Sequence, residues 1–331
     1  KLILKLSVCT TSPTLAPVMP MTESAAGSAS LWGLLGIFTR ALNAAEYTSL
    51  EIAYLRCLLT GVGLLILHGI KNPQVLRVGK QGVLTSIIFG VLTYTAGFLG
   101  YAFSIERIPV AMSAVLSFMS PVWVCLIGLV VFRERVQRKQ VISIAFCLLG
   151  AVLITNLLGV QEMRFDMLGM LAAILNGVGI AAQVSVPRYF SGRYERDTML
   201  TYGFLGASAF MALFVDHGKI LHSFVAPGGL SVIFNVLCLG IPCTLVANTC
   251  FVKSACYVKP TTSCILSALE VVVSTIVGFL LFQENLTALQ LLGGAIIVAA
   301  SLGMELLGHA NPPALEEKGT DAGNETAVKP R

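Results

Sequence analysis

Long apolar runs separated by short polar segments fill the chain from about residue 24 to about residue 307. Runs of about 20 apolar residues match helices that cross a lipid bilayer. The pattern therefore predicts an all-α integral membrane protein with ten transmembrane helices. The expected spans are roughly 24–44, 49–70, 82–104, 108–131, 140–157, 167–187, 197–216, 228–252, 260–282 and 287–307. Residues 1–23 and the polar tail 308–331 are expected to be disordered.

One pattern occurs twice, in Ser113–Ala151 and again, 150 residues later, in Ser263–Ser301. Each copy is an apolar run, a glutamate two positions after a phenylalanine, a short polar turn and a second apolar run, which together predict a helical hairpin. Five spans per half is an odd number, so the second half enters the membrane in the opposite direction. We therefore expect two inverted five-helix repeats, at 24–157 and 165–307, an architecture found in many secondary transporters.

The composition excludes most soluble classes. Hydrophobic residues make up 56% of the chain and charged residues only 12%, against about 25% charged residues in soluble domains. The net charge of +5 comes from basic residues in short loops that form no groove-sized patch, so no nucleic-acid partner is expected. The nine cysteines include no CxxC pair, so we expect neither a zinc site nor any other metal or cofactor.

The distribution of lysine and arginine orients the ten spans. With the N-terminus inside, three basic residues fall in the outer loops, Arg107, Arg164 and Lys219. The inner loops and tail then hold fifteen: Lys71, Arg77, Lys80, Arg133, Arg135, Arg138, Lys139, Arg188, Arg193, Arg196, Lys253, Lys259, Lys318, Lys329 and Arg331. Because cytoplasmic loops carry the basic excess, we expect a multi-pass protein of the inner (plasma) membrane with both termini in the cytoplasm.

Short motifs add a family resemblance. They are Trp32–Gly33 with Arg40 downstream, Arg56, Pro121–Val122, Phe132 to Glu134, Glu270–Val271 and Phe282 to Glu284. With the ten spans and the repeat, they resemble the EamA-type transporters of the drug/metabolite transporter superfamily over about 24–307. The resemblance implies a basket of two inverted repeats around a central cavity for a small-molecule substrate. Val271 replaces a proline that the family often has after the glutamate, which leaves a kink in span nine open.

Glu270 is the strongest candidate for a functional residue, because it lies almost at the centre of the span 260–282. A carboxylate facing lipid there would cost about 2.5–3.5 kcal/mol, so it must face the bundle interior, be paired or be protonated. It either hydrogen-bonds neighbouring helices, binds a substrate amine or carries a coupling proton. Arg56 lies about 10 Å deep in span two, and either anchors the bundle or contacts substrate.

The remaining candidates lie on spans one and four and at the hairpin turns. Trp32 and Trp123 are packing residues or substrate platforms. The others on span four are Ser117, Ser120 and Pro121, and Ser120 is the repeat counterpart of Glu270. Glu134 and Glu284 follow helix ends, where negative charge is disfavoured. We expect them to cap the next helix in each hairpin turn, with gating as the alternative, and we expect Thr287 and Gln290 to form a capping box.

The sequence thus predicts a secondary transporter that exports a small amino-acid-like metabolite by alternating access within a lipid bilayer, with possible proton coupling. A channel-like or sensor protein is one alternative and an intramembrane enzyme another. An enzyme would need clustered carboxylates and histidines or a nucleophile with its base, whereas His68, His217, His222 and His309 are scattered. We therefore expect no enzymatic activity, and the sequence assigns no oligomeric state.

The topology makes a first prediction. Reporter domains that work only in the cytoplasm should be active when fused in the loops 71–81 and 133–139, and periplasmic reporters should be active at 158–166. A periplasmic signal from a fusion at residue 135 would rule out ten inverted spans.

Overall fold

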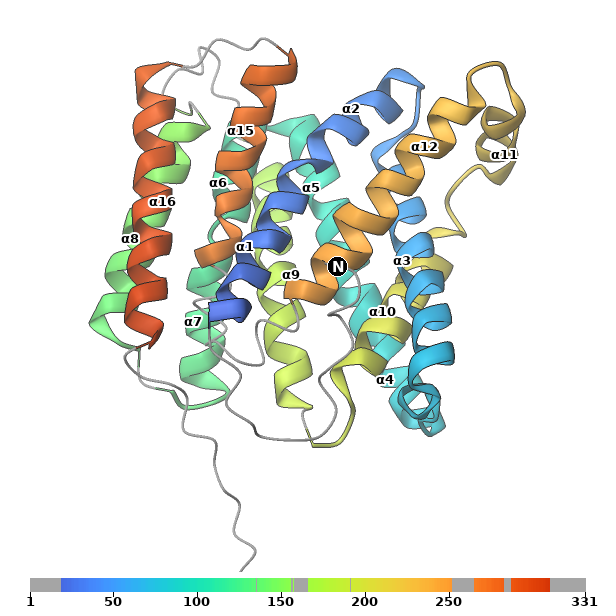
Figure 1. Cartoon of the computed structure of the whole chain (residues 1–331), viewed down its shortest axis with the longest axis horizontal. Coiled ribbons are helices and arrows are strands. Elements are labelled where there is room, and N and C mark those ends of the chain that lie inside the picture. The colour runs from blue at the N-terminus through green and yellow to red at the C-terminus, as the bar shows by residue number, and fades with distance from the viewer. Residues whose placement is uncertain are drawn as a thin grey trace, which may run out of the picture.

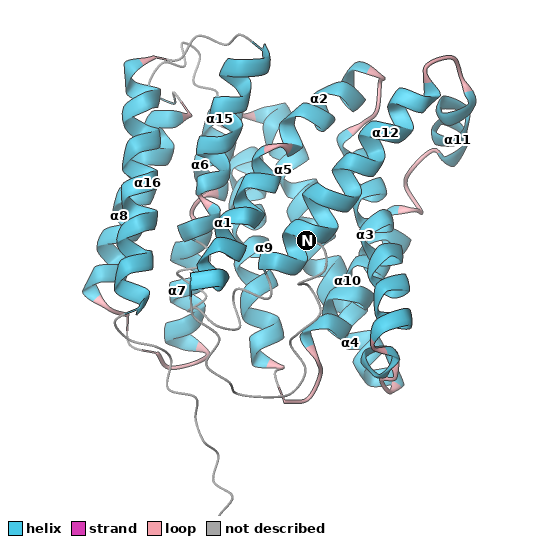
Figure 2. Cartoon of the chain, in the orientation of Figure 1, coloured by secondary structure: helices cyan, strands magenta, loops and turns pink. Residues whose placement is uncertain are grey.

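We describe the protein from a computed structural model covering residues 19–134, 136–155, 157, 166–190, 192–251, 265–282 and 287–309. These residues form helices joined by turns and loops, and no strand occurs among them (Figure 2). The terminal segments that the sequence predicts to be disordered lie almost wholly outside these residues. So do Glu284, nearly all of the loop 158–166 and the first residues of the ninth span.

Every predicted span overlaps at least one helix. In chain order the helices are α1 (Met19–Gly33), α2 (Leu35–Ala44), α3 (Ser49–Lys71), η2 (Pro73–Leu76), α4 (Lys80–Gly90), η3 (Val91–Thr95), α5 (Ala96–Arg107), α6 (Val110–Ser117), α7 (Ser120–Val130), α8 (Arg138–Ile154), α9 (Met167–Tyr189), α10 (Arg196–Met211), α11 (His217–Val225), α12 (Gly229–Gly240), η5 (Ile241–Val246), α15 (Leu269–Phe282) and α16 (Ala288–His309). They stand roughly upright side by side (Figure 1).

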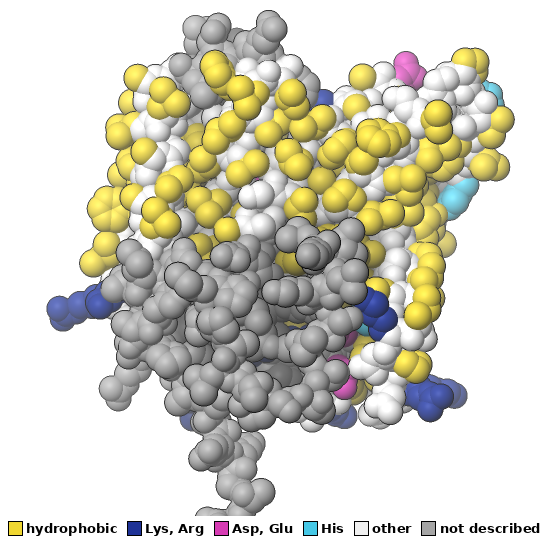
Figure 3. Space-filling view, viewed as in Figure 1, with side chains coloured by type: hydrophobic (Ala, Val, Ile, Leu, Met, Phe, Trp, Pro, Cys, Tyr) yellow, Lys and Arg dark blue, Asp and Glu magenta, His cyan; other side chains and the backbone are white. Residues whose placement is uncertain are grey.

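Five helical stretches among the described residues are long and apolar enough to cross a membrane, and two shorter apolar helices accompany them. The long stretches are Ser49–Lys71, Lys80–Arg107, Met112–Val130, Met167–Tyr189 and Gly229–Phe251, and the shorter ones are Ile265–Leu281 and Ala288–Gly303. Apolar side chains are spread over the upper part and the right side of the face seen in Figure 3, as expected of a surface in contact with lipid. The hydropathy pattern did not predict α11, a short helix capped by the Asp216 side chain.

The two hairpins of the repeat run in opposite directions (Figure 1). α7 runs down to the lower edge and α8 returns upward, whereas α15 runs up and α16 returns downward. α8 and α16 lie side by side, so the halves meet along these helices. Gly150 and Gly293 make the contact, because a Cβ added to Gly150 would lie 2.8 Å from the Gly293 carbonyl oxygen. Such small residues let helices pack closely where no hydrophobic effect drives them together.

Four long helices are interrupted near their midpoints, and the interruptions match at the offset of 150 residues. The π-helical segments η3 and η5 begin at Val91 and Ile241. A break at Phe118 separates α6 from α7, and a turn at Ala268 precedes α15. The two halves therefore share their irregularities as well as their helices.

The predicted fourth span, 108–131, is consequently two helices rather than one. Pro121 lies in the first turn of α7, where its missing N–H group leaves no hydrogen bond unmade. In the second half the helix turns at Ala268 although Val271 replaces the family's proline, so this turn needs no proline. Short-range bonds hold it, since the Ala268 N–H donates to the Ile265 carbonyl at 3.1 Å.

The closest helix crossing generates a stability prediction. A Cβ on Gly90 would lie 1.9 Å from the Gly203 carbonyl oxygen on α10, and a backbone atom cannot rotate away. Gly90→Ala should therefore lower stability by about 1–3 kcal/mol, the usual cost of overpacking, measured as thermal unfolding in detergent. Gly36→Ala is the matched control, because nothing lies within 4 Å of its added Cβ. Equal melting temperatures for the two variants would contradict this packing.

Candidate functional site

The structure brings Arg56 of α3 and Glu270 of α15 into electrostatic range of each other. The two residues come from opposite halves of the chain, and both are half-buried. The ion pairs between described residues do not include this pair, so the two charges face each other without direct contact. The Glu270 carboxylate has no hydrogen-bond partner among the described residues. The arrangement therefore leaves hydrogen-bonding capacity on both charges.

The turn at Ala268 explains how a carboxylate is tolerated at this depth. Glu270 lies in the first turn of α15, directly after the interruption. The N–H groups of a helix's first turn have no partner within the helix, and they give this end a partial positive charge that favours an anion. Gly33 of α1 packs against the same turn, since its added Cβ would lie 3.0 Å from the Glu270 carbonyl oxygen. Gly33 thus lets α1 approach the turn that carries Glu270.

Three residues that sequence analysis missed complete the surroundings of the two charges. The Arg56 Nε–H donates to the Thr244 hydroxyl at 3.1 Å, and the guanidinium lies over the Phe98 ring at 4.6 Å. Tyr101 of α5 interacts electrostatically with Glu270. A weak signal existed: Phe98 and Tyr101 are one helical turn apart in the glycine-rich third span, and Thr244 follows Pro242.

Trp32 and Trp123 both pack against a hydrophobic cluster that contains Val124, Val184 and Phe251. The Trp32 and Phe251 rings pack edge to face with centroids 4.9 Å apart. The Trp123 indole N–H is buried without a hydrogen-bond partner, which is unusual because buried polar atoms are normally paired. Packing accounts for both rings, and the unpaired N–H keeps Trp123 a candidate for contact with a bound molecule.

The candidates on the fourth span lie around its interruption. The Ser117 hydroxyl donates to the Ser113 carbonyl at 2.9 Å and accepts from the Asn176 amide of α9 at 3.0 Å. Its hydrogen bonds therefore join α6 to α9. Ser120 and Pro121 are buried at the start of α7, and Ser120 occupies the position that Glu270 holds after the turn of the second half.

Glu134 takes a different partner from the one expected. It lies in the turn between α7 and α8, but Gln137 and Gln140 form the capping box of α8. The Glu134 carboxylate instead pairs with Arg188 of α9, and the Arg188 guanidinium stacks 4.3 Å from the centroid of the Phe132 ring. The hairpin of the first half is thereby tied to the second half. The capping box of Thr287 and Gln290 is confirmed, with the Thr287 N–H 2.9 Å from Gln290 Oε1.

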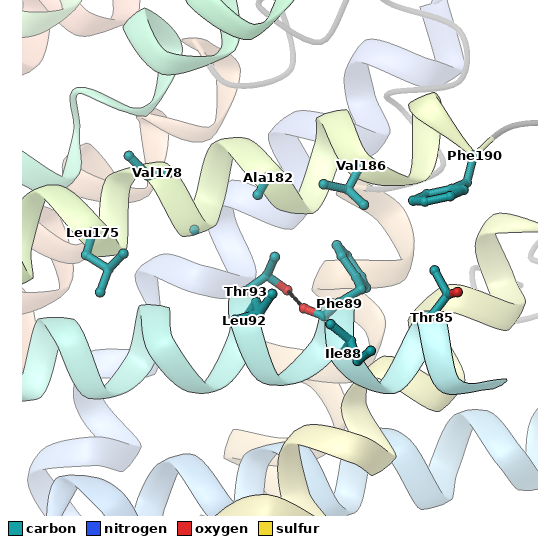
Figure 4. A pocket seen from close by; sticks show the side chains of 11 residues that line it. Thr85, Ile88, Phe89, Leu92, Thr93, Leu175, Val178, Ala182, Val186 and Phe190 are labelled. Carbon is teal, nitrogen blue, oxygen red and sulfur yellow. Dashed lines mark hydrogen bonds between the residues drawn. The ribbon is translucent and has the colours of Figure 1, made fainter. Parts of the chain in front are cut away.

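A separate groove of about 430 Å³ lies between α4–η3 and α9 (Figure 4). Its lining is apolar apart from two threonines, and Figure 4 shows the side chains of the two helices facing each other across it. Leu92 in the wall is 65% exposed on the outer surface of the bundle. Neither Arg56 nor Glu270 lines the groove, which is consequently a lipid-facing feature and not the candidate site.

The described residues hold no group of three or more His, Cys, Asp or Glu side chains that could bind a metal ion. A half-buried arginine and a half-buried carboxylate that form no ion pair can instead bind complementary charges. An arginine binds carboxylates through parallel N–H bonds, and a carboxylate accepts hydrogen bonds from an ammonium group. The site is therefore suited to reversible binding of a molecule that carries both charges.

Known proteins resemble the chain along nearly its whole length. Residues 24–156 and 167–306 match the family described as the EamA-like transporter family. An uncharacterized transporter of Archaeoglobus fulgidus is 29% identical over 279 residues, covering 83% of this chain and 92% of the relative. The pseudopaline exporter CntI of Pseudomonas aeruginosa is 23% identical over 255 residues, covering 77% and 85%. Protein PecM of Dickeya dadantii is 24% identical over 284 residues, covering 85% and 91%.

A solved structure shares the fold. A crystal structure of another protein superposes with a TM-score of 0.67 at 18% sequence identity, covering 88% of this chain and 98% of that one.

The pairing of Glu134 with Arg188 yields a prediction that separates a turn-stabilising role from gating. Both side chains are partly exposed, so Glu134→Gln should cost at most about 1 kcal/mol of stability. The charge-swapped double variant, Glu134→Arg with Arg188→Glu, should restore the melting temperature that either single reversal lowers. If each single reversal lowers the transport rate much more than the stability, and the charge-swapped variant restores the rate, the pair acts as a gate. Rates that follow stability would leave it a structural tie.

Proposed function

Because this chain belongs to the EamA-like transporter family and is a multi-pass membrane transporter, we propose that it exports a small amino-acid-like metabolite by alternating access. In this proposal Arg56 binds the carboxylate of the metabolite and Glu270 its ammonium group. The observation that carries the proposal is the pair itself. Two opposite charges, one from each half, interact within the bundle without a direct ion pair.

The chemistry of the pair favours a zwitterion over other small molecules. Each charge within a membrane costs several kcal/mol unless it is compensated. A zwitterion compensates both at once and adds no net charge to the site. An uncharged sugar would form an ion pair with neither charge, and a simple anion or cation would form one with a single member of the pair. The Phe98 and Tyr101 rings beside the charges add apolar contact area for the rest of the molecule.

The inverted hairpins support alternating access. In carriers with inverted repeats, the substrate site lies near the midplane between the repeats and is formed by discontinuous helices. Here the units 24–157 and 165–307 would rock against each other around Arg56 and Glu270. The interruptions before α7 and α15 and within η3 and η5 would supply the irregular backbone of such a site.

The direction of transport and the orientation of the protein in the membrane rest on two further arguments. A relative that covers 77% of this chain is named as an exporter, which favours export. Lys and Arg side chains gather mainly toward the lower part of the face in Figure 3, the side on which α7 ends and α8 begins in Figure 1. This asymmetry supports an inner-membrane protein whose termini are cytoplasmic. Protonation of Glu270 when the ammonium group leaves would couple export to a proton.

A channel is the second candidate, and the same pair argues against it. Channels select ions with rings of like groups around a pore, whereas the described charges here are single and opposite. An ion would be attracted by one member and repelled by the other.

Transport assays in proteoliposomes test the proposal with three probes that differ only in charge: L-phenylalanine, 2-phenylethylamine and 3-phenylpropionate. The zwitterion should be transported best. Glu270→Gln should accumulate normally but lower L-phenylalanine transport at least about tenfold, the effect of losing one hydrogen bond to a charged group, and remove its pH dependence. Arg56→Gln should lower transport similarly. The control is Glu106→Gln, which neutralises an exposed acid. Unchanged rate and pH dependence in Glu270→Gln would remove Glu270 from the mechanism.

A further inference from the structure

We infer that Thr244 is a positioning residue, which holds the Arg56 guanidinium so that its two terminal nitrogens remain available to a carboxylate. The inference rests on the proposed function for the identity of the bound group. It rests on geometry alone for the restraint on Arg56.

The π-helical segment η5 places the Thr244 hydroxyl where it can donate one hydrogen bond and accept another. The Thr244 hydroxyl donates to the Leu239 carbonyl oxygen at 2.7 Å, five residues earlier in the chain. Its single proton is used in that bond, so the oxygen acts as the acceptor for the Arg56 Nε–H at 3.1 Å. Thr244 is 0% exposed, and water does not compete for either bond. A valine of the same shape would keep the packing and lose both bonds.

The guanidinium is restrained from a second direction by Phe98. Its plane lies over the Phe98 ring at 4.6 Å, while Thr244 holds its Nε edge. Phe98 belongs to the first half of the chain and Thr244 to the second. An arginine has five N–H donors, of which the hydrogen bonds among the described residues use one. The two terminal nitrogens carry the other four, and one N–H from each can bind a carboxylate in two parallel bonds.

The repeat shows that this use of the π-helical segment is specific to the second half. The residue 150 positions before Thr244 is Tyr94, in the matching segment η3. Tyr94 is buried against Phe204, with ring centroids 4.0 Å apart, and packs at its edge on Phe89. The same backbone irregularity therefore supports an aromatic stack in one half and an arginine contact in the other. The segment η3 forms without a threonine at this position, whereas in η5 the Thr244 hydroxyl bonds both the Leu239 carbonyl and Arg56.

The experiment compares Thr244→Val with Thr244→Ser, which keeps the hydroxyl. The first readout needs no substrate: the hydrogen-exchange rate of the Arg56 Nε–H, followed by NMR of arginine-labelled protein and assigned by its loss in Arg56→Lys. Thr244→Val should exchange at least about tenfold faster than wild type, because the bond to a charged group is gone. Thr244→Ser should match wild type. If Thr244→Val does not accumulate, Thr244→Ala takes its place.

The second readout is transport of L-phenylalanine, with 2-phenylethylamine as competitor. Thr244→Val should raise the KM for L-phenylalanine about tenfold and leave inhibition by 2-phenylethylamine unchanged, since the amine does not use Arg56. Wild-type exchange and KM in Thr244→Val, or a Thr244→Ser variant that behaves like Thr244→Val, would overturn the inference. Faster exchange in a protein that transports the zwitterionic, cationic and anionic probes equally well would uphold the positioning of Arg56 and refute the zwitterion proposal.

Discussion

Satisfying the backbone hydrogen bonds of interrupted helices is the constraint on which this structure depends. In the hydrocarbon layer no water pairs with a freed N–H or C=O group, so an interruption survives only where protein supplies the partner. Side-chain hydroxyls do so here: Thr244 bonds the Leu239 carbonyl in η5, and Thr93 bonds the Phe89 carbonyl in η3, each at 2.7 Å. These bonds let the helices change their winding near mid-span, and the altered winding carries Thr244 to Arg56.

Much of the fold follows from the sequence, because lipid leaves few options. A segment that crosses the bilayer must be long, apolar and helical, and each such segment is visible in the hydropathy pattern. The repeat at an offset of 150 then fixes the inverted arrangement by counting spans. The interruptions were not predictable in the same way. Pro242 lies in the first turn of η5, where a proline disturbs a helix, but the break at Phe118 lies before Pro121, and the turn at Ala268 has no proline nearby. Prolines therefore account for only one of these interruptions.

Some residues of the candidate site could be predicted from the sequence, and others could not. Arg56 and Glu270 stand out from sequence because a charge in a membrane is costly and so needs a reason. Thr244, Phe98 and Tyr101 cost little in an apolar helix, so the sequence gives only a weak signal that distinguishes them from packing residues. Glu134 was placed correctly in a hairpin turn and assigned the wrong partner, because a turn in sequence does not reveal that Arg188 of another helix lies beside it. Partners across helices are the information that only the fold supplies.

The difference between the halves gives the site its polarity. The backbone repeats its turns and π-helical segments, but the chemistry does not: Ser120 stands where the second half has Glu270, and Tyr94 where it has Thr244. A glutamate at Ser120 as well would place a second carboxylate in the bundle, with its own cost of burial. One carboxylate and one arginine lower that cost for each other. In the proposed cycle the repeated backbone lets either half move against the other, while the unrepeated charges bind one molecule in one orientation.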